Sequence, residues 1–381
     1  MEKYYKISLI IFPIILIIVI LYSSIALYLH DPLQIWHKPF FRKNFNTYSY
    51  TMRESARAVI RDYDFDSVII GNSHSENTSS KRAGEILGNG KFVNLSVSGS
   101  TTYEKKIILD YLFKNKNIKQ VVYFLDANYL AQNKENKTFP IKNYDMLYNN
   151  TPYDDFRIYL NDRYFFCSLL FQTKETCTGK ALNIDKPYAW DNEEDYKKRF
   201  GGFENWIKNK NQKEIKDLFK SVLKTPKQIN IDKLDVDYIL KSHEYMDNYL
   251  YSVIKNNENV QFYIVIPPVT DLLLSMQIRD KKQSFLKSGD MLKFLVNRNK
   301  NFKNVELYAF DDGENIGDIK FYKDRTHFNT DINYFILNSI AKKEHILTED
   351  NINEYLQKVE EKAKKVDFDY YYDKIQKVKG S

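Results

Sequence analysis

Ser73 stands where a nucleophile would be placed in an α/β protein. It follows the apolar, β-branched run at 67–70, and Gly71 between them lets the backbone turn sharply. At the end of a parallel strand it would lie at the sheet's carboxyl edge, where ligands bind. A helix opening just beyond would offer amide hydrogens to a developing oxyanion. The alternative is that Ser73 and Asn72 only cap a helix, because both residue types are common N-caps.

A serine hydroxyl is a weak nucleophile until a base takes its proton, and the pair Asp324 and His327 can supply that base. An acid three residues before a histidine on a tight turn can hold the imidazole Nδ1–H, which leaves Nε2 to face the serine. The chain has six histidines, and this one stands just before an amphipathic helix predicted at 331–342. We expect this turn to lie at the same sheet edge as Ser73.

Two polar residues beside Ser73 have competing interpretations. His74 either contacts substrate and shapes the oxyanion loop, or makes a structural hydrogen bond within the turn. Asn77 is interpreted as a cap residue rather than a ligand. We give neither a catalytic role.

The elements that must position these residues alternate between strands and helices. That alternation predicts an α/β fold with a parallel sheet and helices on both faces. After the third strand it stops, and the polar, tyrosine-rich stretch at about 130–232 is interpreted as an insertion or lid with its own helices. Residues 346–381 form a charged, helical tail. The predicted strands are 67–70, 92–95, 120–125, 260–266 and 305–308; the predicted helices are 52–62, 80–87, 101–114, 235–255, 281–297 and 331–342.

Residues 7–29 are uncharged and rich in isoleucine and leucine. As a helix they would reach about 35 Å, enough to cross a hydrocarbon core of roughly 30 Å. A cleaved signal peptide is the alternative, with Ser24-Ile25-Ala26 as a small-x-small site, but the run continues past that site. We therefore expect residues 1–29 to anchor the chain in a lipid bilayer, residues 30–65 to form a linker and lead-in helix, and the remainder to be exported.

Composition narrows the possible functions further. The net charge of +7 is spread along the chain and no nucleic-acid motif occurs, so a nucleic-acid partner is not expected. Cysteine and histidine spacing indicates no metal site, and we expect no cofactor. Cys167 and Cys177 either close a disulfide loop in an oxidising compartment or are two unrelated buried thiols.

These motifs together resemble the SGNH (GDSL-like) hydrolase superfamily. Gly71-Asn72-Ser73 resembles its first block, Gly99 the glycine of its second, and Asp324-x-x-His327 its last. The resemblance implies a three-layer, flavodoxin-like catalytic domain over 66–345. It also implies Ser73 as nucleophile, His327 as base, Asp324 as its orienter, and the amides of Ser73 and Gly99 as oxyanion donors.

The third block of that superfamily, Gly-x-Asn-Asp, is only partly matched. Asn128 falls on its asparagine and would be a third oxyanion donor, but Asp126 replaces the glycine and Tyr129 the acid. This departure is similar to membrane-anchored SGNH proteins that work with membrane-bound O-acyltransferases in cell-envelope acylation.

Three functions follow as expectations. The first is a membrane-anchored acyltransferase that moves an acetyl or similar group through a Ser73 ester onto an extracytoplasmic glycan. The second is an esterase that removes such groups with the same residues. The third is a catalytically silent scaffold that keeps the fold for binding a partner.

Overall fold

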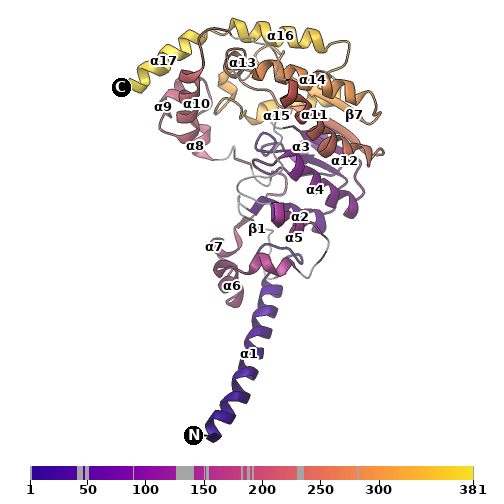
Figure 1. Cartoon of the computed structure of the whole chain (residues 1–381), viewed down its shortest axis with the longest axis vertical. Coiled ribbons are helices and arrows are strands. Elements are labelled where there is room, and N and C mark those ends of the chain that lie inside the picture. Colours follow the sequence, from indigo (N-terminus) through magenta and orange to yellow (C-terminus); the bar gives the residue numbers. More distant parts are fainter. Residues whose placement is uncertain are drawn as a thin grey trace. The chain divides into compact units, whose positions relative to one another are not determined.

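The computed structural model describes most of the chain, in two compact units (Figure 1). Residues Met1–Tyr63 and Pro140–Asn183 form the first unit; residues Asp64–Phe139 and Ile184–Ser381 form the second. The insertion expected at 130–232 is therefore divided between the two units. The described residues are 2–40, 46–47, 51–88, 90–125, 141–149, 151, 154–181, 183–186, 189–190, 193–229, 236–280 and 283–380.

A five-stranded parallel sheet forms the centre of the second unit. Its order is β3-β2-β4-β6-β7, so the strand that precedes Ser73 has a parallel neighbour on each side. Apolar, β-branched residues at buried positions explain why these short segments form strands. The predicted α/β class with a parallel sheet is confirmed. The strands are β2 (Ser67–Ile70), β3 (Phe92–Asn94), β4 (Gln120–Phe124), β6 (Gln261–Ile266) and β7 (Val305–Ala309).

Helices follow the strands at or near the predicted places, and α13 is an additional helix that was not predicted. Helix α15 packs against α3, whereas α14 packs against α11 and β7, and α4 packs against α12. Thr101 and Glu104 form the predicted capping box that begins α4. These helices are α3 (Ser80–Leu87), α4 (Thr102–Asn115), α11 (Val236–Met246), α12 (Ser252–Lys255), α13 (Asp271–Gln277), α14 (Ser284–Asn299) and α15 (Thr330–Lys342), with a π-helix at Asp247–Tyr251 and a 3-10 helix at Ile319–Phe321.

The charged tail is helical, as predicted, and its helices are packed into the second unit. Helix α16 contacts α13 and α14, and α17 contacts α10. One face of α16 is buried, which explains how so charged a segment joins a core. The tail helices are α16 (Ile352–Lys365) and α17 (Phe368–Gly380). Earlier in the chain, the same unit contains α8 (Glu194–Lys197), α9 (Phe203–Lys208) and α10 (Lys213–Lys224).

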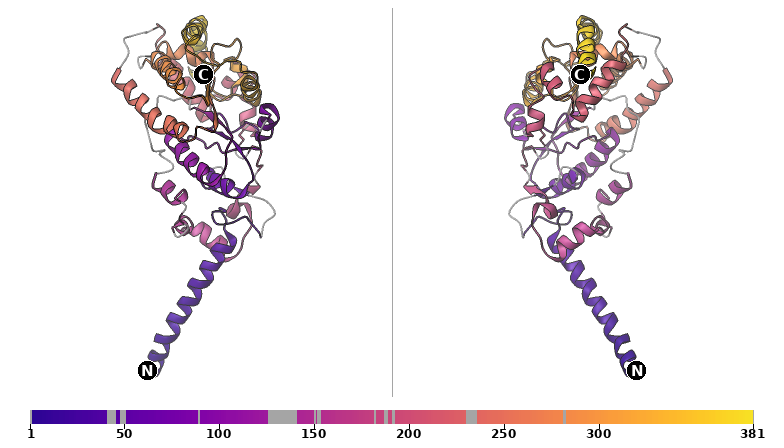
Figure 2. Two further views of the ribbon diagram at one scale, coloured as in Figure 1. Left: turned by 90° about the vertical axis from the view of Figure 1, so that its right-hand side faces the viewer. Right: turned by 90° about the vertical axis from the view of Figure 1, so that its left-hand side faces the viewer.

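The first unit begins with helix α1 (Glu2–His30), which continues through Pro13 without a break (Figure 2). Its span Leu9–His30 is the one candidate membrane helix of the described residues, and most of its large apolar side chains are exposed. It is compatible with a single-pass anchor, as predicted. The unit also contains α2 (Met52–Asp62), α5 (Ile141–Leu147), a 3-10 helix (Asp155–Tyr159), α6 (Asp162–Leu169), α7 (Glu175–Thr178) and the antiparallel pair β1 (Asn46–Thr47) and β5 (Lys180–Ala181).

Three sets of contacts hold this first unit together. Helix α1 packs against α6, where the Tyr22 hydroxyl donates to the Leu169 carbonyl at 2.8 Å. The Arg57 guanidinium forms a buried ion pair with Asp155. Cys167 and Cys177 form a disulfide with a Cα–Cα distance of 5.5 Å, which confirms the first of the two interpretations of these cysteines.

Candidate active site

The second unit brings Ser73, His327 and Asp324 together. The Ser73 Oγ lies 2.8 Å from His327 Nε2, and His327 Nδ1 lies 2.8 Å from Asp324 Oδ2. Ser73 comes from the turn after β2 and the other two residues from the loop before α15. This is the expected order of hydrogen bonds for a serine activated through a histidine that an acid orients.

Close packing makes glycine necessary at position 71. A Cβ there would lie 2.3 Å from the Ser75 Oγ and 2.7 Å from the Phe124 Cβ. The φ angle of Gly71 is not positive, so glycine is not required there for a left-handed backbone. The residue is needed because the turn carrying Ser73 passes directly against β4.

Ser73 does not cap a helix. Helix α3 begins at Ser80, and its N-cap is Ser79, whose hydroxyl accepts from the Arg82 amide. The backbone from Asn72 to Thr78 instead forms consecutive turns. The helix predicted at 80–87 is therefore present, and these turns separate its N-terminus from Ser73. The N-terminus of α3 is occupied by Asp185, whose carboxylate accepts from the Lys81 amide at 2.7 Å.

Asp324 is buried and held by several donors. Its Oδ1 accepts from the backbone amides of Thr326 and His327, at 2.9 and 3.0 Å. Burial alone would raise the pKa of Asp324. The adjacent His327 and Lys323 outweigh burial and hold the pKa of this carboxyl well below its usual range. Asp324 is therefore ionised at neutral pH, as the orienting acid must be.

His74 is buried and packs against His327. Its ring stacks on that of His327 with centroids 5.0 Å apart, and its Nδ1 lies 2.7 Å from the Asn72 Oδ1. Burial, together with the charge of His327, lowers the pKa of His74 well below 6.5, so His74 is neutral. The structure favours the hydrogen bond within the turn over contact with substrate. Asn77 is also not a helix cap, because its Oδ1 accepts from the Trp190 amide.

The loop after β3 lies beside the Ser73 turn and carries the second expected oxyanion donor. Gly99 has a φ of +62°, and the Ser100 hydroxyl and Val97 amide both donate to the Gly71 carbonyl. The Ser73 amide has no hydrogen-bond partner among the described residues, so it is free to donate to a ligand. Asn128, the third expected donor, lies outside the described residues.

Two residues that sequence reasoning did not identify also contact this site. The Trp190 indole N–H donates to the Ser73 carbonyl at 2.8 Å, and its ring meets that of His327 edge-on at 5.7 Å. The Lys323 ammonium lies 3.3 Å from Asp324 Oδ2. Lysine immediately before the Asp324 motif was a usable signal. Trp190 had none, because it lies in the weakly periodic stretch.

Glu76 is a second buried acid close to the oxyanion loop. Its side chain is 4% exposed and hydrogen-bonds Ser98, the residue before Gly99. Burial raises the pKa of Glu76 to about 8, against the opposing effects of Lys323 and Ser98. Glu76 is therefore largely protonated at neutral pH, whereas Asp324 is ionised.

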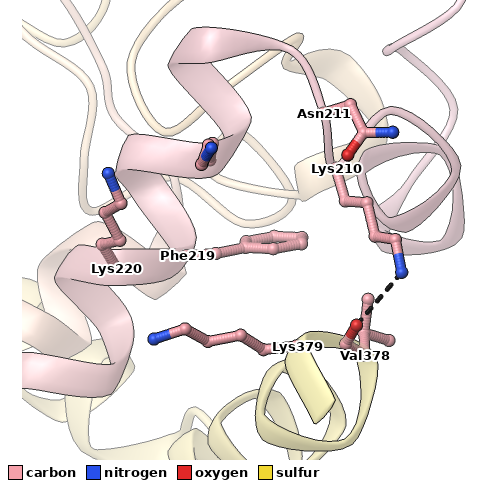
Figure 3. A pocket seen from close by; sticks show the side chains of 7 residues that line it. Lys210, Asn211, Phe219, Lys220, Val378 and Lys379 are labelled. Atoms are coloured by element: carbon pink, nitrogen blue, oxygen red, sulfur yellow. Dashed lines mark hydrogen bonds between the residues drawn. The ribbon is translucent and has the colours of Figure 1, made fainter. Parts of the chain in front are cut away.

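The described residues contain no cluster of histidine, cysteine and acidic side chains that could hold a metal ion. A separate cavity of about 210 Å³ lies between α10 and α17 (Figure 3). The Lys210 ammonium donates to the Val378 carbonyl at its edge, and the Phe219 ring lies across its middle. None of the described residues that line it is acidic, and we assign it no catalytic role. Its lining residues are Lys210, Asn211, Lys216, Phe219, Lys220, Val378 and Lys379.

No family model, curated protein or solved structure matches this chain.

Proposed function

We propose that the chain is a membrane-anchored serine acyltransferase of the SGNH type, which carries an acyl group on Ser73. The observation that carries this proposal is the continuous hydrogen-bond path from the Ser73 hydroxyl through His327 to the buried, ionised Asp324. Such a path raises the nucleophilicity of serine and keeps the imidazole in the tautomer that accepts a proton at Nε2.

The strand order also supports the SGNH assignment. Numbered along the chain, the parallel strands have the spatial order 2-1-3-4-5, the order of flavodoxin-like sheets. In such sheets ligands bind where strand order reverses, next to the first strand. Ser73 follows β2, the first strand of this sheet, and Gly99 follows the neighbouring β3.

The chemistry has two halves. Ser73 Oγ attacks the carbonyl carbon of an acyl ester while His327 Nε2 takes the hydroxyl proton. The amides of Ser73 and Gly99 would stabilise the resulting oxyanion. Collapse breaks the ester bond, and His327 returns its proton to the departing alkoxide. An acceptor hydroxyl then gives its proton to His327 and attacks the acyl-Ser73 ester. The acyl–Oγ bond breaks, the acylated product leaves, and His327 returns the proton to the Ser73 Oγ.

The acceptor that we propose is a hydroxyl of an extracytoplasmic cell-envelope glycan. The candidate membrane helix supports an anchored enzyme, and the Cys167–Cys177 disulfide supports an oxidising compartment. An enzyme anchored in the membrane must receive its acyl group from a donor that is also at the membrane. A membrane-bound O-acyltransferase is therefore the proposed partner. Hydrolysis differs only in that water takes the place of the sugar hydroxyl.

A fluorophosphonate probe tests the nucleophile directly. We expect the intact protein in detergent to react at Ser73, the Ser73→Ala variant not to react, and His327→Ala to react much more slowly. Ser221→Ala is the matched control, because the Ser221 hydroxyl donates to the Asp217 carbonyl within α10 and its loss should leave labelling unchanged. Persistent labelling of Ser73→Ala contradicts the assignment, and an unreactive parent favours the scaffold. Turnover of p-nitrophenyl acetate with and without a glycan acceptor separates transfer from hydrolysis.

A further inference from the structure

Lys323 is a buried cation next to the candidate catalytic acid. The residue is 5% exposed. A buried ammonium without partners carries a large desolvation penalty, so its surroundings must offset that penalty. The charged and titratable groups that act electrostatically with it are Asp324, His74, Glu76 and Glu214.

Two aromatic rings and one carboxylate surround this ammonium. Its Nζ lies 4.2 Å from the centroid of the Tyr196 ring, 4.7 Å from that of Trp190, and 3.3 Å from Asp324 Oδ2. Both ring distances are within the range of about 6 Å for cation–π attraction, which is strongest where water is excluded. The cation therefore attracts the Asp324 turn and the aromatic segment at once.

The aromatic segment in turn contacts the nucleophile and the base. Trp190 donates from its indole to the Ser73 carbonyl and packs edge-on against the His327 ring. The Lys323 amide also donates to the His327 carbonyl at 3.0 Å, which closes the Asp324 turn. One side chain thus lies between the loop that carries the acid and base and the segment that contacts the serine.

We propose that Lys323 is a positioning residue, whose ammonium, held between Trp190 and Tyr196, fixes the Asp324 turn and Trp190 so that His327 faces Ser73. The inference rests on the proposed function for its effect on rate. Its structural part, the fixing of Trp190, stands independently of it. A lysine that only fills space would be replaced by an apolar side chain of similar size without loss, or with a gain in stability.

The test compares Lys323→Met with Lys323→Arg in the full-length protein. Methionine keeps an unbranched side chain of similar length and removes the charge, whereas arginine keeps a charge that can stack on aromatic rings. The matched control is Lys320→Met, because Lys320 is half-exposed and pairs with Asp318 away from the triad. The readouts are the fluorophosphonate labelling rate, its pH profile, and the NMR signal of the Trp190 indole N–H, which Trp190→Phe identifies.

We expect Lys323→Met to label about 10- to 100-fold more slowly, because small misplacements of catalytic groups have effects of this size. Its indole signal should shift, and Lys323→Arg should recover most of the rate. The acidic limb of the rate profile should move to higher pH, because losing the Lys323 cation removes one of the charges that lower the pKa of Asp324.

The proposal is overturned if Lys323→Met labels at a rate within twofold of the parent, or if its Trp190 indole signal does not shift. A parent protein that does not label contradicts the proposed function instead. The indole signal then still decides whether Lys323 fixes Trp190. If Lys323→Met does not fold, which thermal unfolding reports, the same criterion applies to Lys323→Gln.

Discussion

Replacing Asp324 with asparagine is the most informative single change at this site. The carboxylate accepts on both sides, from two backbone amides at Oδ1 and from His327 Nδ1 and Lys323 at Oδ2. An asparagine can keep the hydrogen bonds on only one of these two sides. Whichever way its amide turns, an N–H₂ group faces donors. The arrangement that keeps the backbone hydrogen bonds forces His327 Nδ1 to become an acceptor, and Nε2 then carries the proton and cannot take one from Ser73.

The expected loss in rate is large. A base in the wrong tautomer lowers the rate roughly 10⁴-fold in serine triads, which corresponds to about 5 kcal/mol in the activation free energy. Stability should fall as well, because the buried Lys323 ammonium loses its counter-charge. Breaking one partner of a buried ion pair typically costs about 3–5 kcal/mol in the free energy of unfolding.

A double variant separates the two effects. In Asp324→Asn combined with Lys323→Met no unpaired cation remains, so we expect most of the stability to return while the rate stays low. The measurements are kcat/KM for p-nitrophenyl acetate and denaturant-induced unfolding of each variant, followed as a double-mutant cycle. If Asp324→Asn keeps more than about a tenth of the parent rate, Asp324 does not orient the base. If the double variant is no more stable than the single one, the pairing of Lys323 with Asp324 contributes nothing.

The remaining predictions address the acid behind the site, the turn and the first unit. Glu76 has a pKa of about 8 in the folded protein against 4.5 in the unfolded chain. Its contribution to the free energy of unfolding is therefore fully present below pH 4.5 and is lost as the pH rises through 8. Relative to Glu76→Gln, the parent's free energy of unfolding should fall by up to roughly 5 kcal/mol over that range in pH-dependent denaturation; parallel curves would contradict the assignment. Gly71→Ala should cost about 1–3 kcal/mol in thermal unfolding, whereas Gly289→Ala, whose new Cβ would meet only ordinary contacts at 3.5 Å within a helix, should be neutral or stabilising. Replacing Cys167 and Cys177 by serine should lower the free energy of unfolding of the first unit by about 2–3 kcal/mol. In the parent protein, both cysteines should fail to react with maleimide when whole cells are denatured without reductant.

Local patterns in the sequence were sufficient for the regular elements of the second unit. The β-branched run at 67–70 is β2 with the predicted bounds, and the capping box at Thr101 begins α4. These predictions succeeded because hydrophobic runs and caps act over a few residues. The helix predicted at 80–87 is α3 with those bounds, but its cap could not be predicted, because Ser73 and Ser79 are both suitable caps and only the turns at 72–78 decide between them.

Long-range contacts were beyond the same reasoning. The meeting of Ser73 with His327 could be inferred because parallel strands bring their carboxyl ends to one edge of the sheet. No comparable rule places Trp190 on the Ser73 carbonyl or Tyr196 over Lys323, because these residues lie in a stretch without periodicity. A buried lysine is equally hard to predict, since isolated sequence favours an exposed ammonium.

The separation of Ser73 from the cap of α3 has a practical consequence. Within the part of the chain that the structure describes, the Ser73 hydroxyl bonds only to His327, while Ser79 begins the helix. Under the proposed function, activity depends on Ser73, whereas the start of α3 depends on Ser79. Ser73→Ala protein should keep a native-shaped site that binds the acyl donor without consuming it. Isolated from its own membrane, that variant would retain the natural donor for identification by mass spectrometry.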